Sequence, residues 1–488
     1  MLFMKNKIYT ACLSMLMVTK CLAFEINNYQ NAWNKLIKNP QNLKKFVTNM
    51  PLGADLHCHV SGAVATEQLV KLAQEQQYCI NDRFVISKPI AGSCPNANFT
   101  NVFLRSAANQ KKTLEAWSMQ NFVPNKDEDN KTHFFDAFKK FSLVAHENQV
   151  EVITTIINDA HSQYIQYLEL MLGMHGEIPK VALPAENHAI ADVLNNPEYT
   201  KYIQDNIAYF ANLKNAIKTK TPWLGNDVDV AWILEIKRNQ PFEHFWINAV
   251  LAFAITDKVH DIVAINMVEP EYALIASQDY VKQIKLLEIL HLYFPKVKIV
   301  MHAGELPVDV AQHSSVDHIA TVLEYLQPLR IGHGAVIAYE KNQEKTIANM
   351  AQQSIPIEIN LSSNEKILGI KGSQHPLKTY IKKQVPVVIS SDNPGISKSN
   401  LSAEYLKALN EHKISLADLI QANRNSLTYS LLSGKSLWKD SKKAIPVNDC
   451  QFFKSNQCIR FIANNPKAYQ QWLLEENLDS YFKTSLPL

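Results

Sequence analysis

Short apolar runs alternate with segments of helical periodicity along most of the chain, and this alternation predicts the fold. Such an alternation is typical of a parallel sheet with crossover helices. Eight β-α units in one chain predict an α/β protein with a closed (β/α)8 barrel, although an open doubly wound sheet fits the same pattern. The predicted strands are the run that ends at residue 59, then 164–172, 228–236, 262–268, 298–302, 330–333, 356–361 and 386–391.

Other segments fall outside this pattern and predict additions to a barrel that spans residues 51–435. Residues 24–50 have an amphipathic helical pattern, and 78–100 has the Pro and Gly content of a loop insertion. The stretch 174–222 is longer than an ordinary connection and partly helical, so we expect an insertion at the barrel rim. The tail, 436–488, ends in a predicted helix over 468–482 that packs outside the barrel.

The first 23 residues have the order of a secretory signal peptide. Lys5 and Lys7 precede an apolar run over 8–18, and Cys21-Leu22-Ala23 provides a small-x-small cleavage site. A buried N-terminal helix is the alternative interpretation. The run is too short to span a bilayer comfortably, so we expect cleavage after Ala23 and a secreted or periplasmic protein that is free of the membrane.

Charge adds little to this picture. The 488 residues are 47% hydrophobic and 19% charged, with a formal net charge of +3. Removing Lys5, Lys7 and Lys20 with the predicted signal peptide leaves 46 basic residues (49 minus 3) against 46 acidic ones. A balanced surface gives no reason to expect nucleic acid or an anionic membrane as a partner, and it leaves a homodimer open.

Export permits disulfides, and five cysteines remain in the mature chain. Pairing Cys79 with Cys94 and Cys450 with Cys458 closes two short loops and is the most economical arrangement. Four cysteines allow three connectivities, so the other two stay open. Cys58 is left over, and we expect it to be a small buried apolar residue.

Titratable side chains gather at the carboxyl ends of the predicted strands. Side chains alternate along a strand, so His57 and His59 lie on the same side of the first one. An ordinary structural explanation, such as a helix cap or a turn residue, exists for each of the other residues when it is taken singly, namely His302, Glu305, His333 and Asp392. In a (β/α)8 barrel, however, all these ends face one mouth, and a single site explains them together. The residues are His57, His59, His302, Glu305, His333 and Asp392.

Three imidazoles and a carboxylate suit zinc, which takes nitrogen and oxygen ligands and keeps a position for water in catalytic sites. Zinc would lower the pKa of that water toward neutrality. Glu305 follows His302 by three residues and can lie beside the metal as a proton donor, and His333 can hold or deprotonate the water.

Longer motifs surround these residues. They are Asp55-Leu56-His57-Cys58-His59 with Gly62-Ala63, Met301-His302-Ala303-Gly304-Glu305, Arg330-Ile331-Gly332-His333-Gly334, Glu358-Ile359-Asn360-Leu361-Ser362-Ser363-Asn364, His375-Pro376 and Ser391-Asp392-Asn393-Pro394. In this order they resemble the adenosine deaminase family over residues 51–433, and the signal peptide and additions resemble its secreted, growth-factor-related branch. The resemblance implies that one zinc ion is held by His57, His59, His302 and Asp392. Glu305 would protonate N1 of the purine, while His333 and Asp392 would orient the attacking hydroxide.

Three positions depart from the family pattern in the substrate pocket. Ser61 replaces an Asp that reaches the ribose 5′-hydroxyl, and Asn393 replaces an Asp that contacts N7. Glu269 stands where the family has a glycine whose amide meets N3. An amide can donate to N7 without being protonated first, so purine binding is compatible with Asn393. The departures leave the reaction type intact and the exact substrate open.

We therefore expect zinc-dependent deamination of adenosine to inosine and ammonia, and the same reaction of 2′-deoxyadenosine. One alternative is a deaminase of another aminopurine; AMP would need a basic cluster, which Ser61 and Glu269 do not supply. The other is a secreted nucleoside-binding or receptor-binding protein whose catalysis is weak or lost.

Overall fold

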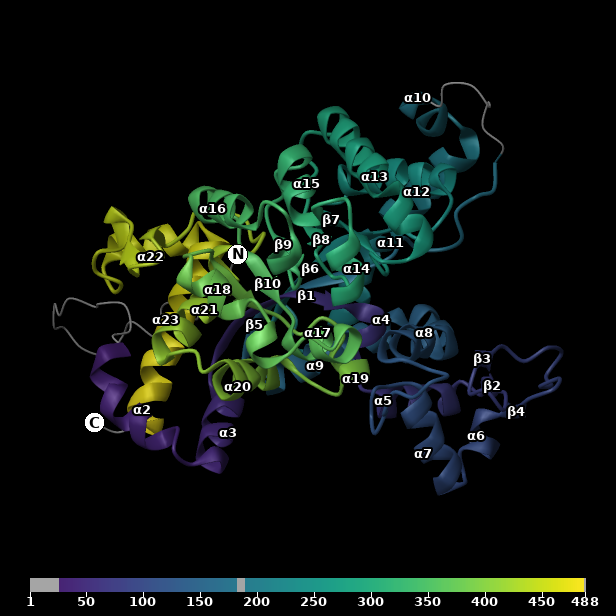
Figure 1. Ribbon diagram of the computed structural model, residues 1–488, viewed down its shortest axis with the longest axis horizontal. Coiled ribbons are helices and arrows are strands. Elements are labelled where there is room, and N and C mark those ends of the chain that lie inside the picture. Colours follow the sequence, from purple (N-terminus) through teal and green to yellow (C-terminus); the bar gives the residue numbers. More distant parts are fainter. Residues whose placement is uncertain (1–25, 182–188, 487–488) are drawn as a thin grey trace.

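The computed structural model describes residues 26–181 and 189–486, so the predicted signal peptide lies outside the described residues. Eight parallel strands form two four-stranded sheets, in the orders β1-β5-β6-β7 and β11-β10-β9-β8. Figure 1 shows them at the centre of the molecule, surrounded by helices. The strands are β1 (Leu52–His59), β5 (Ile165–Leu172), β6 (Asp229–Lys237), β7 (Ile262–Val268), β8 (Met301–Ala303), β9 (Ile331–His333), β10 (Ile357–Ile359) and β11 (Val387–Ile389).

The two sheets close into a barrel through two parallel bridges. Cys58 is paired with Asp392, just beyond β11, and the amide of His59 donates to the carbonyl of Asp392 at 2.9 Å. On the other side Ile265 of β7 is paired with Ile299, two residues before β8. Because both seams are hydrogen-bonded, the predicted closed barrel is confirmed over the open sheet.

Helices cover the outside of the barrel and follow the strands in sequence. Several begin at polar side chains that accept from the first backbone amides of the helix, among them Ser106, Asp129, Asn400 and Ser415. The connecting helices are α4 (Val60–Ala63), α5 (Thr66–Glu75), α6 (Thr100–Phe103), α7 (Ala107–Ala116), α8 (Asn130–Glu147), α9 (Gln149–Ser162), α12 (Phe242–Thr256), α13 (Leu274–Tyr293), α14 (Val308–His313), α15 (His318–Tyr325), η2 (Ile337–Tyr339), α16 (Gln343–Gln353), α17 (Leu361–Leu368), η3 (Gly372–Gln374), α18 (Leu377–Lys382), α19 (Pro394–Ser397), α20 (Leu401–His412) and α21 (Leu416–Thr428).

The segment predicted as a loop insertion over 78–100 contains a small antiparallel sheet. Its strands β2 (Cys79–Ile80), β3 (Ile86–Ser87) and β4 (Asn98–Phe99) are each two residues long. The Cys79–Cys94 disulfide links β2 covalently to the loop that precedes β4. The longer insertion near 174–222 carries α10 (Ile190–Leu194) and α11 (Pro197–Lys218).

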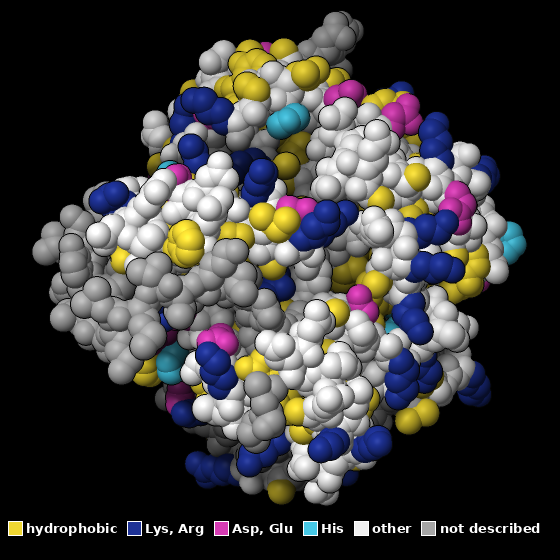
Figure 2. Space-filling model, turned by 90° about the vertical axis from the view of Figure 1, so that its left-hand side faces the viewer, with side chains coloured by type: hydrophobic (Ala, Val, Ile, Leu, Met, Phe, Trp, Pro, Cys, Tyr) yellow, Lys and Arg dark blue, Asp and Glu magenta, His cyan; other side chains and the backbone are white. Residues whose placement is uncertain are grey.

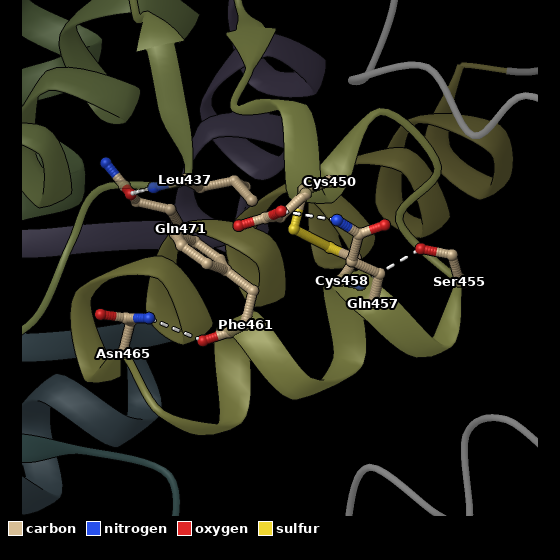
Figure 3. Close-up of a disulfide and its surroundings, with 9 residues drawn as sticks. Leu437, Cys450, Ser455, Gln457, Cys458, Phe461, Asn465 and Gln471 are labelled. Carbon is tan, nitrogen blue, oxygen red and sulfur yellow. Dashed lines mark hydrogen bonds between the residues drawn. A yellow bond between two sulfur atoms is a disulfide. The ribbon is translucent and has the colours of Figure 1, made fainter.

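The C-terminal tail forms a compact unit with its own apolar cluster and the second predicted disulfide, Cys450–Cys458. Figure 3 shows this disulfide beside the bond from the amide of Leu437 to the Gln471 side chain, at 2.7 Å. Both predicted pairings are therefore confirmed, and Cys58 is buried and free. The tail contains β12 (Trp438–Asp440), β13 (Ile445–Pro446), η4 (Asn448–Cys450), α22 (Asn456–Ala463) and α23 (Pro466–Ser485).

The two ends of the described chain pack against each other outside the barrel. Phe46 of α3 stacks edge-on against Phe482 of α23, with 5.2 Å between ring centroids, and Tyr481 donates to the carbonyl of Phe46 at 2.7 Å. Figure 1 shows α2 and α3 beside α23. The N-terminal elements are η1 (Ile26–Tyr29), α2 (Gln30–Leu36) and α3 (Pro40–Asn49).

The surface carries charges of both signs. In Figure 2, basic side chains are scattered in small groups over the visible face, between acidic and hydrophobic ones. Among the described residues, none of the helices has the length and apolar character needed to cross a membrane.

Candidate active site

Four side chains meet where β1, β8 and β11 end. His57 and His59 lie on one side of β1 because a strand alternates its side chains, His302 lies in β8, and Asp392 follows β11. Their ligand atoms all lie within 4.8 Å of one another. Nε2 of His59 is 3.2 Å from Nε2 of His302, and Oδ1 of Asp392 is 3.5 and 3.4 Å from Nε2 of His57 and His59.

In each of the three candidate ligand histidines, the Nδ1 atom contacts an oxygen of another side chain, which orients the imidazole. Such partners fix the ring and leave Nε2 free for a cation. Nε2 of His57 is buried without a hydrogen-bond partner among the described residues, which is the expected state of a metal ligand without its ion. The donor set of three nitrogens and one carboxylate oxygen therefore fits zinc. The Nδ1 contacts are His57 to Glu358 at 2.7 Å, His59 to Glu235 at 2.8 Å and His302 to Asn266 at 2.9 Å.

Our sequence interpretation did not assign a role to these three partners. The sequence signal that could have identified them is a polar side chain inside an apolar strand. A buried carboxylate requires a hydrogen-bonding or charged partner, so such a residue indicates a polar contact inside the barrel. Glu358 is completely buried in β10 and is also bonded by the guanidinium of Arg330, which donates to Glu169 at 2.6 Å. This network ties the His57 side of the site to the barrel wall.

Burial and nearby charges set the protonation of the four candidate ligands. Burial and the neighbouring His57 and His333 hold the pKa of His302 well below its usual value. Burial works against ionisation of Asp392, but the neighbouring imidazoles of His57 and His333 outweigh it and lower the pKa of Asp392. Burial alone would lower the pKa of His57, but Asp392 and Glu358 outweigh it and raise the value to about 10. A cation would therefore replace a proton on His57.

Glu305 and His333 lie next to this cluster. Oε1 of Glu305 is 3.7 Å from Nδ1 of His333, and both side chains are buried. Burial, together with the charges of Asp392 and Glu271, raises the pKa of Glu305 well above its usual value, which favours the protonated form of its carboxyl. Burial lowers the pKa of His333 to about 3, so its imidazole is neutral. A proton donor and a neutral imidazole thus stand beside the four candidate ligands.

His333 is held in place by residues from the next strand end. In the side chain of Asn364, Nδ2 lies 2.9 Å from Nδ1 of His333, and Oδ1 lies 3.0 Å from Nε2 of His375. The amide of Leu377 donates to Nδ1 of His375, so His375 donates to Asn364 through Nε2. The predicted motifs around Asn364 and His375 therefore orient the ring of His333.

Glycines allow the close approach of elements in the site. A Cβ on Gly332 would lie 2.6 Å from Cε1 of His57, and one on Gly62 would lie 2.1 Å from Oδ1 of Asn393. Asp392 and His333 themselves have φ values of 61° and 66°, in the left-handed region that costs non-glycine residues energy. Such strain is common at functional sites.

The three positions that differ from the family pattern lie around the mouth. Ser61 is half-buried in α4, directly after β1. Asn393 donates from Nδ2 to Oδ1 of Asp392 at 2.8 Å, so it supports the carboxylate of a candidate ligand. Glu269 has a φ of 78°, a conformation that favours glycine, and its carboxylate accepts from the amide of Asn239 at 2.9 Å. Contact of these three side chains with a substrate stays a prediction.

Comparison with known proteins places this geometry in context. The family model described as "Adenosine deaminase" matches residues 110–439. An adenosine deaminase from Clostridium acetobutylicum is 28% identical over 135 residues, which are 28% of this chain and 37% of that protein. The alignment thus spans little more than a third of that curated relative.

Solved structures share the fold at low sequence identity. An amidohydrolase from Burkholderia ambifaria, solved with bound zinc, is 15% identical and covers 90% of this chain and 94% of its own, with a TM-score of 0.53. An adenine deaminase from Arthrobacter aurescens is 14% identical and covers 85% of this chain and 99% of its own, with a TM-score of 0.52. Both similarities show the fold.

Proposed function

Because the chain belongs to the adenosine deaminase family, whose model matches 110–439 of its 488 residues, we propose that it is a zinc-dependent aminohydrolase. Its proposed substrates are adenosine and 2′-deoxyadenosine, which it would hydrolyse to inosine and 2′-deoxyinosine, respectively, with release of ammonia. The observation that carries the proposal is the meeting of four ligand atoms within 4.8 Å, next to the buried carboxyl of Glu305, whose pKa is raised by burial.

In this proposal His57, His59, His302 and Asp392 hold the zinc ion. Zinc, when bound, supplies a Lewis acid that lowers the pKa of water and provides hydroxide at neutral pH. The chain's own residues supply orientation: Asn393 bonds Oδ1 of Asp392, and the imidazoles are fixed through their Nδ1 atoms.

Glu305 acts in this proposal as the general acid. Its buried carboxyl keeps a proton and donates it to N1 of the purine, which makes C6 more electrophilic. His333 is neutral and faces the same space, so it and Asp392 orient the hydroxide that attacks C6. The proton of the added hydroxyl then passes to the amino group, the C6–N bond breaks, ammonia leaves, and the oxygen remains on the ring as a carbonyl beside the protonated N1. Glu305 regains its proton from the water that becomes the next hydroxide.

The test of this assignment is Glu305→Gln, which keeps the size of the side chain and removes the acidic proton. We expect kcat to fall by at least about 100-fold with one zinc ion still bound. Glu404→Gln is a matched control, because Glu404 is also a buried carboxyl but bonds the amide of Ser362 and the hydroxyl of Ser399. Near-normal turnover of Glu305→Gln would contradict the assignment.

A second candidate is a related aminopurine substrate. It is favoured by the departures at Ser61, Glu269 and Asn393, which lie where the family contacts the nucleoside. Following the ultraviolet change with adenosine, 2′-deoxyadenosine, adenine and AMP separates the candidates. No change with any of the four compounds, for zinc-loaded protein, would favour a nucleoside-binding or receptor-binding role instead.

We also propose that the protein is secreted or periplasmic. The two disulfides support this proposal, because such bonds persist in oxidising compartments. Mass spectrometry of the exported protein tests it, and the expected N-terminus is Phe24.

A further inference from the structure

Glu271 is a buried carboxylate that the proposed reaction does not use. It lies between β7 and α13, three residues beyond the end of β7, and its exposed fraction is 0%. Its two oxygens accept from consecutive backbone amides: Oε1 from Gly304 at 3.2 Å and Oε2 from Glu305 at 2.8 Å. One side chain therefore holds both amides of the loop that carries the proposed proton donor.

Close packing leaves this loop little room to shift. Gly304 has a φ of 75°, which glycine adopts readily, and a Cβ at this position would lie 2.9 Å from Cδ1 of Ile319. Ile319 therefore packs closely against the loop, and Glu271 bonds its two amides.

Glu271 is in turn fixed by two cationic or hydrogen-bonding side chains. Nδ1 of His318 lies 2.5 Å from its Oε1, and a guanidinium nitrogen of Arg238 lies 3.9 Å from the same oxygen. Burial would raise the pKa of Glu271, but His318 and Arg238 outweigh it and lower the value to about 2. Both oxygens are therefore free of protons and can accept.

Arg238 connects this arrangement to the metal-ligand strand. It is completely buried, and it donates from Nη2 to the carbonyl of Met267 at 2.5 Å and to that of His302 at 3.3 Å. Arg238 thus contacts the backbone at His302, and Glu271 contacts it at Gly304 and Glu305. Together they fix the position of the acid relative to the metal ligand.

We propose that Glu271 is a positioning residue that holds the Gly304–Glu305 backbone so that the Glu305 carboxyl stays beside His333 and within reach of the purine. The catalytic part of this inference rests on the proposed function. Glu271 acts through Glu305 and is not itself a catalytic residue. Displacing a reacting group by about 1 Å can reduce a rate about 100-fold, so the contact matters for turnover more than for binding.

Glu271→Ala and Glu271→Gln in the full-length, zinc-loaded protein test the proposal. For Glu271→Ala we expect faster hydrogen–deuterium exchange at residues 304 and 305, one zinc ion per chain, and a kcat about 100-fold lower with KM within about threefold. Glu271→Gln retains one acceptor oxygen and should recover about tenfold of the lost kcat. If Glu271→Ala does not fold, the same exchange and kinetic measurements on Glu271→Gln test the proposal.

Glu475→Ala is the control. Glu475 is also a buried carboxylate, but it lies in the tail helix α23, where its two oxygens accept from Nε and Nη2 of Arg424 at 2.7 and 2.8 Å. We expect unchanged exchange at 304 and 305, a lower Tm, and kcat within about threefold of the unsubstituted protein.

Two results would overturn the proposal. One is unchanged exchange at residues 304 and 305 in both Glu271 variants, and the other is a normal kcat despite faster exchange there. Absence of deamination by the unsubstituted protein would contradict the proposed function instead. In that case the exchange comparison still decides whether Glu271 holds the loop.

Discussion

His57 is the residue whose protonation most directly links the site to a cation. Without metal, Asp392 and Glu358 raise its pKa to about 10, so at pH 7 the imidazole carries a proton that a metal ion must displace. We expect zinc uptake at pH 7 to release about one proton from His57, and affinity to fall about tenfold for each unit of pH decrease. Calorimetry in buffers of different ionisation enthalpy measures this release. A binding heat independent of the buffer would contradict it.

Glu235 tests whether the outer carboxylates matter for metal binding. It holds Nδ1 of His59 at 2.8 Å, so Glu235→Ala frees the ring to rotate and should weaken zinc binding by about 10- to 100-fold. Glu243→Ala is the control, because Glu243 is exposed at the start of α12. Competition with a zinc chelator gives both affinities. Equal affinity in the two variants would show that the contact does not orient the ligand.

At this scale the sequence reveals ligand types better than their partners. His57 and His59 are recognisable because strand alternation places both on one side, and His302, His333 and Asp392 follow other predicted strands. Glu358 and Glu235 meet their histidines across 301 and 176 residues, and no local pattern specifies such pairs. Their register depends on how the barrel closes.

At the scale of elements, the eight barrel strands were predictable from their apolar runs, whereas the strands of the small antiparallel sheet were not. The predicted strands at 164–172 and 262–268 differ by at most one residue from β5 and β7. In contrast, β2, β3 and β4 are two residues long, too short for a periodic pattern. They are specified by mutual pairing and by the Cys79–Cys94 disulfide, which are tertiary constraints.

The close approach of β9 to β1 gives a prediction at the same scale. In Gly332→Ala, the new Cβ would lie 2.6 Å from Cε1 and 2.9 Å from Nδ1 of His57, so the ring must move away from Glu358. We expect the loss of zinc affinity to be about tenfold or more. Gly173→Ala is the control, because the nearest atom to its Cβ is 4.0 Å away. Full zinc affinity in Gly332→Ala would show that His57 tolerates the displacement.

At the scale of the whole molecule, the tail stabilises the protein from outside the barrel. Arg424 of α21 and Glu475 of α23 form a buried two-bond ion pair, at 2.7 and 2.8 Å, that joins the tail to the barrel helices. The sequence predicted the final helix, but the partner of Glu475 is 51 residues away and depends on the packing of α21.

The second disulfide permits a test of whether the tail stabilises the protein without supporting the zinc site. Replacing Cys450 and Cys458 by serine removes a cross-link with a sequence separation of 8. Loop-closure entropy for so short a loop predicts a loss of about 2.5 kcal/mol in the free energy of unfolding. Zinc content should be unchanged, because the disulfide lies in the tail cluster, apart from the ligands. Denaturant unfolding measures the free energy of unfolding, and metal analysis measures the zinc content. A loss of zinc would show that the tail also supports the zinc site.

The central claim is that one zinc ion on His57, His59, His302 and Asp392 supports purine deamination, and stoichiometric reconstitution tests it most directly. Metal-free protein is titrated with zinc while the ultraviolet change of adenosine is followed. We predict that activity is absent at the start and rises linearly to a plateau at about one zinc ion per chain, with His302→Ala remaining inactive and incompletely loaded. Activity that is independent of zinc, or full loading of His302→Ala, would contradict the account.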